Sequence, residues 1–157
     1  MNEKVGAAIT DNCFNFDDLT FFSCIPNDGN TYAQIDHNMA LFFTRLRTHS
    51  LRSFSALSAK AVGPETLLAL NNHAQSLKVL KLAGLDSAAV RSLSLLQGCT
   101  ALETLDLMDG DGAVNLEATE NDVFLEVIAW LGRCKSLRDL HMSKLVSAPS
   151  ILTKVCC

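Results

Sequence analysis

A short pattern of leucines that recurs along the chain is the feature that most limits the folds open to this sequence. Each copy reads leucine, two residues, an apolar residue, one further residue and a second apolar residue. The copies begin at Leu51, Leu77, Leu102 and Leu137, and a weaker copy begins at Leu19. The spacings of 26 and 25 residues that follow Leu51 fall within the period of about 20 to 29 residues that is typical of leucine-rich repeats.

The spacing within each copy predicts a short β-strand with one buried face. The fourth and sixth positions are two residues apart, so their side chains share one face of a strand. The fifth position points the other way and is polar in every copy. The fifth-position residues are Ser23, Ser55, Lys81, Asp106 and His141. Each strand is therefore expected to bury its apolar face and to expose its polar face to water.

Stretches with helical periodicity separate the predicted strands. One of them places four apolar residues on a single helical stripe: Ile35, Met39, Phe42 and Leu46. A helix is expected to begin at Pro64, because proline favours the first helical turn. Another is expected to begin after Asp86 or Ser87, either of which can cap it. A further helix is expected over residues 121–131.

Strands and helices that alternate at a regular period predict an α/β fold of a particular kind. We expect a leucine-rich-repeat solenoid, a right-handed β-α superhelix of about five repeats. Its parallel sheet would form the concave inner face and its helices would lie outside. A doubly wound α/β domain is the alternative, but its strands would be covered on both faces and apolar on both. The polar third and fifth positions of the copies beginning at Leu51, Leu102 and Leu137 argue against it.

Two cysteines narrow the type of repeat. Cys99 and Cys134 each stand three residues before the first leucine of a strand, in the segments 95–102 and 131–137. This resembles the cysteine-containing repeat Cys-x-x-Leu-x-x-Leu-x-Leu of F-box/leucine-rich-repeat (RNI-like) proteins, which include many fungal members. Thr48 and Ala74 stand at the cysteine position of the two preceding repeats. The Leu-Pro-x-Glu opening of an F-box is not visible in the sequence.

The resemblance implies a non-catalytic protein–protein interaction module. Such a module would be similar to the substrate-recognition repeats of an F-box-type ubiquitin ligase subunit. The alternative is a structural or degenerate leucine-rich-repeat fragment with no dedicated ligand. We expect residues 1–18 to form a lead-in or partial cap. Residues 19–157 would form the repeat array, truncated at its C-terminal end and carrying an acidic insertion near 109–120.

Two groups of residues are candidates for contact with a protein partner. The first comprises third- and fifth-position residues of the last three copies, which are expected on the concave face: Val79, Lys81, Thr104, Asp106, Asp139 and His141. The second comprises acidic residues of the insertion, which would attract a basic partner or form a solvated loop: Asp109, Asp111, Glu117 and Glu120. A calcium loop is disfavoured, because Val114 stands where such a loop needs glycine.

Composition excludes several other classes of protein. The formal net charge of −4 argues against nucleic acid as the main partner, because phosphate-binding domains are normally basic. No run of 18 apolar residues exists, so a membrane span is not expected. The six cysteines include no Cys-x-x-Cys pair, and the four histidines are scattered. Neither zinc nor a disulfide framework is therefore expected.

The remaining expectations concern location and chemistry. With no signal peptide visible at the start of the chain, we expect an intracellular protein, in the cytoplasm or nucleus, with reduced cysteines. His141, Asp106 and Ser143 could be grouped on paper as a catalytic set. No nucleophile elbow, phosphate loop or metalloprotease motif accompanies them. The sequence therefore predicts no enzymatic activity and no cofactor.

Overall fold

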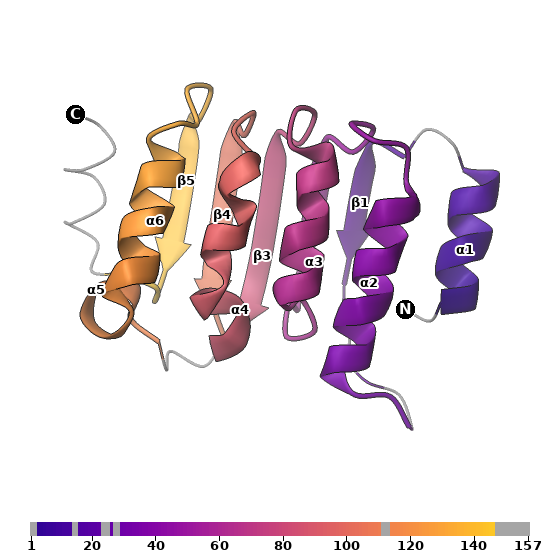
Figure 1. The fold of residues 1–157 in the computed structure, drawn as a ribbon, viewed down its shortest axis with the longest axis horizontal. Coiled ribbons are helices and arrows are strands. Elements are labelled where there is room, and N and C mark those ends of the chain that lie inside the picture. Colours follow the sequence, from indigo (N-terminus) through magenta and orange to yellow (C-terminus); the bar gives the residue numbers. More distant parts are fainter. Residues whose placement is uncertain (1–2, 14–15, 23–25, 27–28, 111–113, 147–157) are drawn as a thin grey trace.

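One parallel sheet organises the part of the chain that the computed structural model describes, namely residues 3–13, 16–22, 26, 29–110 and 114–146. Its five strands lie side by side in the order in which they occur in the chain (Figure 1). The strands are β1 (Asp18–Phe21), β2 (Ser53–Ala56), β3 (Val79–Leu85), β4 (Thr104–Asp109) and β5 (Asp139–Ser143). Each connection thus leads to the neighbouring strand in the same direction, and β1 and β5 stand at opposite edges.

The helices line one face of this sheet, in front of the strands in Figure 1, and α1 lies beside α2 at the end of the row. They are α1 (Glu3–Asn12), α2 (Tyr32–Arg45), α3 (Pro64–Ala69), α4 (Ser87–Arg91), α5 (Leu116–Thr119) and α6 (Asn121–Leu131). Two 3-10 helices complete the layer, η1 (Leu70–His73) and η2 (Leu93–Gly98). Among the described helices, none combines the length and the apolar character needed to traverse a lipid bilayer.

The helix starts confirm most of the local sequence expectations. Pro64 is the first residue of α3, and Asp86 caps α4 by accepting a hydrogen bond from the Ala89 amide at 2.8 Å. The expected helix over 121–131 is α6. The apolar stripe that begins at Ile35 lies on α2 and its C-cap residue Leu46, and its four members are buried in the core.

Strand pairing aligns the last four copies of the motif position by position. Third positions pair across the sheet in the order Ser53, Val79, Thr104, Asp139. Fifth positions pair in the order Ser55, Lys81, Asp106, His141. The copies beginning at Leu51, Leu77, Leu102 and Leu137 are therefore in one register.

The first copy is three residues away from the register that the sequence suggested. Leu19 pairs with Phe54, a fourth-position residue, although it was expected to align with Leu51. Thr20 therefore holds the fifth position expected for Ser23, which lies outside the described residues. Phe16, partly buried against the core, stands where the first leucine of the other copies stands. The apolar residues Leu19, Phe21 and Phe22 fit the spacing of the motif in two registers. The structure adopts the register in which Leu19 and Phe21 hold the fourth and sixth positions.

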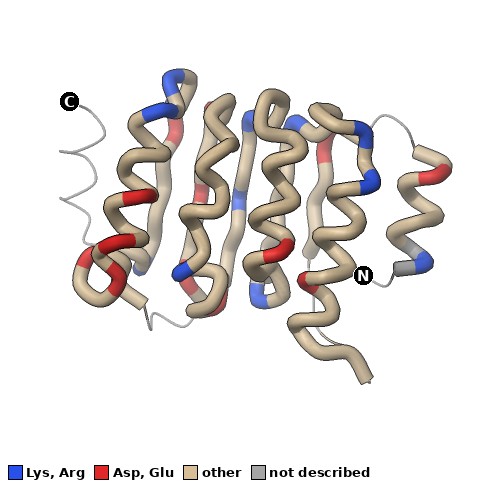
Figure 2. Tube along the Cα trace, viewed as in Figure 1, with Lys and Arg blue, Asp and Glu red and all other residues tan. Residues whose placement is uncertain are grey.

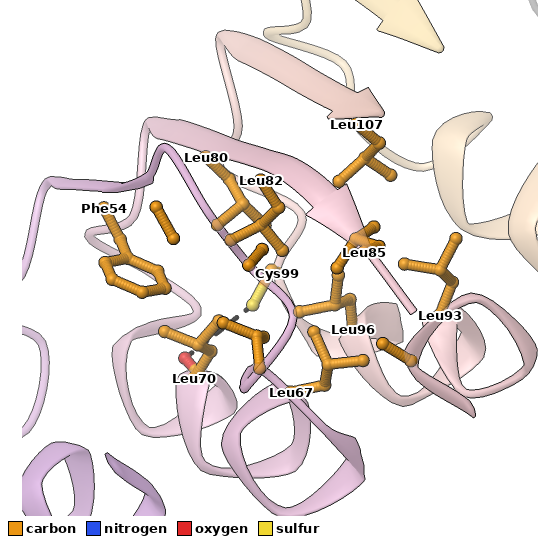
Figure 3. Packing of buried hydrophobic residues seen from close by; sticks show 14 of the residues in the cluster. Phe54, Leu67, Leu70, Leu80, Leu82, Leu85, Leu93, Leu96, Cys99 and Leu107 are labelled. Atoms are coloured by element: carbon orange, nitrogen blue, oxygen red, sulfur yellow. Dashed lines mark hydrogen bonds between the residues drawn. The ribbon is translucent and has the colours of Figure 1, made fainter. Parts of the chain in front are cut away.

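The core lies between the sheet and the helices. The first, fourth and sixth positions of the copies beginning at Leu77 and Leu102 are almost completely buried. Leucines of α3, η1 and η2, among them Leu67, Leu70 and Leu96, approach these side chains from the helix side (Figure 3). Because each strand is short, its apolar side chains are covered only in company with the neighbouring strands and helices.

The two motif cysteines link neighbouring repeats. The Cys99 thiol donates to the carbonyl oxygen of Leu70, 3.7 Å away in the preceding repeat (Figure 3). The Cys134 thiol lies 3.6 Å from the carbonyl oxygen of Cys99, which also accepts a hydrogen bond from Trp130 Nε1 at 3.0 Å. Both thiols are free and buried. Burial raises the pKa of Cys99 to about 12 and also raises the pKa of Cys134.

Candidate functional site

The face of the sheet that points away from the helices carries the third, fifth and seventh positions of each copy of the motif. We call the third-, fifth- and seventh-position side chains of β1–β5 the uncovered face, because every described helix lies on the other side. All six predicted partner-binding residues lie there, on β3, β4 and β5. Lys81, Asp139 and His141 are exposed, and Val79, Thr104 and Asp106 are half-buried.

Cross-strand pairs order the polar side chains on β4 and β5. His141 Nδ1 lies 2.9 Å from Asp106 Oδ1, and Thr104 Oγ1 donates to Asp139 Oδ2 at 3.3 Å. Lys81 and Asp106, both fifth-position residues, are paired in the β3–β4 register. The sequence predicted that these positions would share one face, although it could not predict which hydrogen bonds they would form.

An open hollow of about 570 Å³ lies over this end of the uncovered face. Its polar lining includes the fifth-position residues of three neighbouring strands, Lys81, Asp106 and His141, together with Thr104, Arg138 and Asp139. Charges of both signs surround the hollow. It can therefore accept hydrogen bonds from a ligand through its carboxylates and donate them through Lys81 and Arg138.

The seventh positions belong to the same face, and apart from Ser143 they were missed from the sequence. They are Phe22, Leu57, Ala83, Met108 and Ser143. Phe22 is 77% exposed and Leu57 is 55% exposed. We call this exposed pair, at the ends of β1 and β2, the apolar corner. Extending the strand alternation one step beyond the six-residue motif would have identified Leu57. Phe22 would still have been missed, because the register expected for the first copy assigned it to the buried fourth position.

Second-position residues form a charged row where the strands begin. Lys78 Nζ lies 2.5 Å from Glu103 Oε1, and this hydrogen bond and the lysine charge hold the pKa of Glu103 below its usual range. The backbone hydrogen bonds at the strand starts follow the same pattern in each copy. The Arg52 carbonyl oxygen accepts the amides of Lys78 and Val79, and the corresponding carbonyls of the neighbouring copies each accept two amides in the same way.

The acidic insertion does not form one exposed row of carboxylates. Asp109 ends β4 and is only 1% exposed, so its expected place in a solvated loop is wrong. Glu117 is half-buried on α5, and Glu120 Oε1 pairs with Arg91 Nε at 2.7 Å. Asp111 lies outside the described residues. Acidic residues still gather around α5 and the start of α6 (Figure 2), where they complement helix N-termini.

The catalytic grouping weighed from the sequence is only partly assembled. Asp106 and His141 are paired, but no hydrogen bond joins Ser143 to His141 within the described chain. The described residues also contain no group of three or more His, Cys, Asp or Glu side chains that could hold a metal ion.

Comparison with models of known protein families finds none that matches this chain, and a search of curated protein sequences finds no significant match.

Proposed function

We propose that the chain is an array of leucine-rich repeats that binds a protein partner through the uncovered face. Three features support the repeat architecture. The strands follow chain order, their motif positions share one register, and the helices lie on one side. The bonds of Cys99 and Cys134 give the motif cysteine a physical role, because each ties its own repeat to the preceding one.

The observation that carries the proposed function is the charged hollow on the uncovered face. Small-molecule sites are usually enclosed and mostly apolar, whereas this hollow is open and lined by Lys81, Asp106, Asp139 and other polar side chains. Paired polar side chains on an open sheet suit a protein surface, where complementary charges set orientation and exclude wrong partners.

The area of the sheet sets a further condition on such a partner. Five strands spaced about 4.8 Å apart, with about four residues each at 3.3 Å, present roughly 300 Å². Stable interfaces usually need about 800 Å² from each partner. The partner would therefore also contact loops at the strand ends.

The resemblance to F-box/leucine-rich-repeat proteins suggests the biological setting, substrate recognition by a ubiquitin ligase. This part of the proposal is tested by capture of a Skp-type adaptor together with the full-length gene product. Failure to capture an adaptor would leave a binding module without a ligase connection.

The proposed binding face is tested with a charge-reversal pair. Asp106→Lys with Asp139→Lys reverses both carboxylates of the hollow, and we expect captured partners to be lost. Asp11→Lys with Glu126→Lys is the matched control, because it makes the same charge change at exposed positions on α1 and α6. Equal capture by both double variants would favour the alternative, a structural repeat fragment with no dedicated ligand on this face.

A further inference from the structure

We propose that the uncovered face binds an extended protein segment with a bulky apolar side chain and, four residues away, a lysine or arginine. This inference rests on the proposed function and adds the chemistry of the partner. Three features of the face support this inference. They are the apolar corner, the carboxylates of Asp106 and Asp139 in the hollow, and Lys81, which lies between the apolar corner and these carboxylates.

The apolar corner offers an anchor for one side chain. Leu57 N donates to Phe21 O at 2.9 Å, one residue beyond the last β1–β2 pair, so Leu57 follows β2 at the level at which Phe22 follows β1. Single exposed apolar residues are ordinary on protein surfaces. Here two large ones are adjacent, and the half-buried side chains of Ala83 and Met108 continue the same row. Burying an aliphatic or aromatic side chain on this row removes apolar surface of both partners from water.

The carboxylates of the hollow offer the second anchor. Asp106 uses Oδ1 for His141, and Asp139 uses Oδ2 for Thr104. An ionised carboxylate has about four acceptor sites, so both groups can accept further hydrogen bonds. A guanidinium or ammonium group of a partner can donate these hydrogen bonds. Hydrogen bonds between charged groups are stronger than those between neutral groups.

The distance between the two anchors fixes the spacing in the partner. Neighbouring strands are about 4.8 Å apart, and residues along a strand are about 3.3 Å apart. With these spacings, the midpoint between Phe22 and Leu57 lies roughly 14 Å from Asp106. An extended peptide covers about 13 to 14 Å in four residues. Residues four apart in an extended segment also point to the same side. One segment can therefore place an apolar residue on the corner and a basic residue on Asp106.

Lys81 makes the spacing selective. It stands on β3, between β2 and β4, and pairs in register with Asp106. A basic side chain two residues from the apolar anchor would point toward the exposed Lys81 ammonium and be repelled. Specific interfaces commonly use such repulsion to exclude wrong registers.

The inference is tested by selecting random twelve-residue peptides displayed on phage against the full chain. We expect enrichment of peptides with an aromatic or aliphatic residue four positions from Lys or Arg. Both chain directions are counted, because the side-chain spacing is the same in each.

Variants then test the two anchors with a synthetic serine- and threonine-based peptide that carries Phe and Arg four residues apart. Asp106→Asn should weaken its binding by about fivefold, the factor that corresponds to about 1 kcal/mol for an accessible ion pair. Leu57→Ser should weaken it to a comparable degree. Glu126→Gln and Leu125→Ser make the same chemical changes at exposed positions of α6 and should leave binding unchanged.

A charge swap at Lys81 tests the spacing directly. Lys81→Glu should increase binding of the peptide with Arg two residues from Phe and thereby reduce the preference for the four-residue spacing. Selected peptides that depend on Asp106 and Leu57 but lack the spacing would overturn this inference and leave the proposed function standing. If binding of every selected peptide is insensitive to both substitutions, the face is not the docking surface and both proposals fall.

Discussion

The carboxylate of Asp36 fills the space that a side chain at Gly63 would need. Oδ1 of Asp36 accepts hydrogen bonds from the amides of Gly63 at 2.8 Å and Thr66 at 3.0 Å, and Oδ2 accepts one from Glu65 at 3.1 Å. A Cβ added at Gly63 would lie 2.4 Å from Oδ2. A buried side chain of α2 therefore caps α3, and the cap requires glycine at position 63.

Gly63→Ala should destabilise the protein by about 2 kcal/mol, because the new methyl group displaces the Asp36 cap and leaves amide donors of α3 without partners. Urea denaturation followed by circular dichroism measures the change. Asp36→Ala removes the same cap from the other side, so it should cost a similar amount. The double variant should cost much less than the sum of the two single variants.

Gly132→Ala is the matched control for this prediction. A Cβ at Gly132 would meet its nearest neighbour, the Ile128 carbonyl oxygen, at an ordinary contact distance of 3.5 Å. The backbone there is helical, with φ −60°, so alanine should be neutral or slightly stabilising through its effect on the unfolded chain. If Gly63→Ala is as stable as Gly132→Ala, the cap does not contribute to folding.

His73 should make the stability of the protein decrease as the pH is lowered through 6.5. Burial lowers its pKa below the ordinary value of 6.5, and the charge on His49 adds to this, while its hydrogen bond to the Phe43 carbonyl opposes it. Nδ1 accepts the Leu51 amide at 3.4 Å, so the proton of the neutral ring is on Nε2, which lies 3.1 Å from Phe43 O. Below pH 6.5 the unfolded chain binds more protons at this residue than the folded chain does. The free energy of unfolding should therefore fall as the pH is lowered through 6.5.

Urea titrations at several pH values measure this dependence, and His73→Gln should flatten it because glutamine does not titrate. A nuclear magnetic resonance titration of the His73 ring in the folded protein gives an independent reading, which does not depend on the variant folding. A ring that protonates with a midpoint at or above 6.5 would contradict the assignment.

Buried thiols should be protected from alkylation. Cys99 and Cys134 are buried, whereas Cys13 is exposed near the end of α1. With its pKa raised from 9.0 to about 12, Cys99 should hold roughly a thousandfold less thiolate at pH 8 than an ordinary cysteine. Timed iodoacetamide labelling with peptide mass spectrometry should find Cys13 modified first, and Cys99 and Cys134 only after denaturation. Labelling of Cys99 at the rate of Cys13 in the folded protein would contradict its burial.

The sequence predicted the strands and the polar row from Leu51 onward because two independent periodicities agree there. Alternation within each copy and the repeat between copies both place Lys81, Asp106 and His141 on one face. At the first copy the repeat signal is weak, and Leu19, Phe21 and Phe22 satisfy the local spacing in two registers. Only tertiary packing, with Phe21 edge-on to Phe54 at 5.9 Å between ring centres, distinguishes them.

Contacts between repeats could not be predicted from local patterns. The residues that form the Asp36 cap on α3 are 27 or more positions apart. Asn71, which accepts from the Gly98 amide and donates to the Leu95 carbonyl, makes a similar long-range bond. Asp109 was misplaced for a related reason. An aspartate beside glycine is typical of a solvated loop, yet here Asp109 is the last residue of β4 and is buried.

The polar pair on β4 and β5 should serve binding more than stability. Asp106 and His141 lie 2.9 Å apart, but their side chains retain 38% and 61% of their exposure, so water screens the interaction. Asp106→Asn and His141→Gln should each change the free energy of unfolding by less than about 0.5 kcal/mol, as exposed pairs usually do. Both variants should nevertheless alter capture of a partner that occupies the hollow. Denaturation and binding measured on the same preparations separate the two roles, and a stability loss comparable to that of Gly63→Ala would show that this pair is structural.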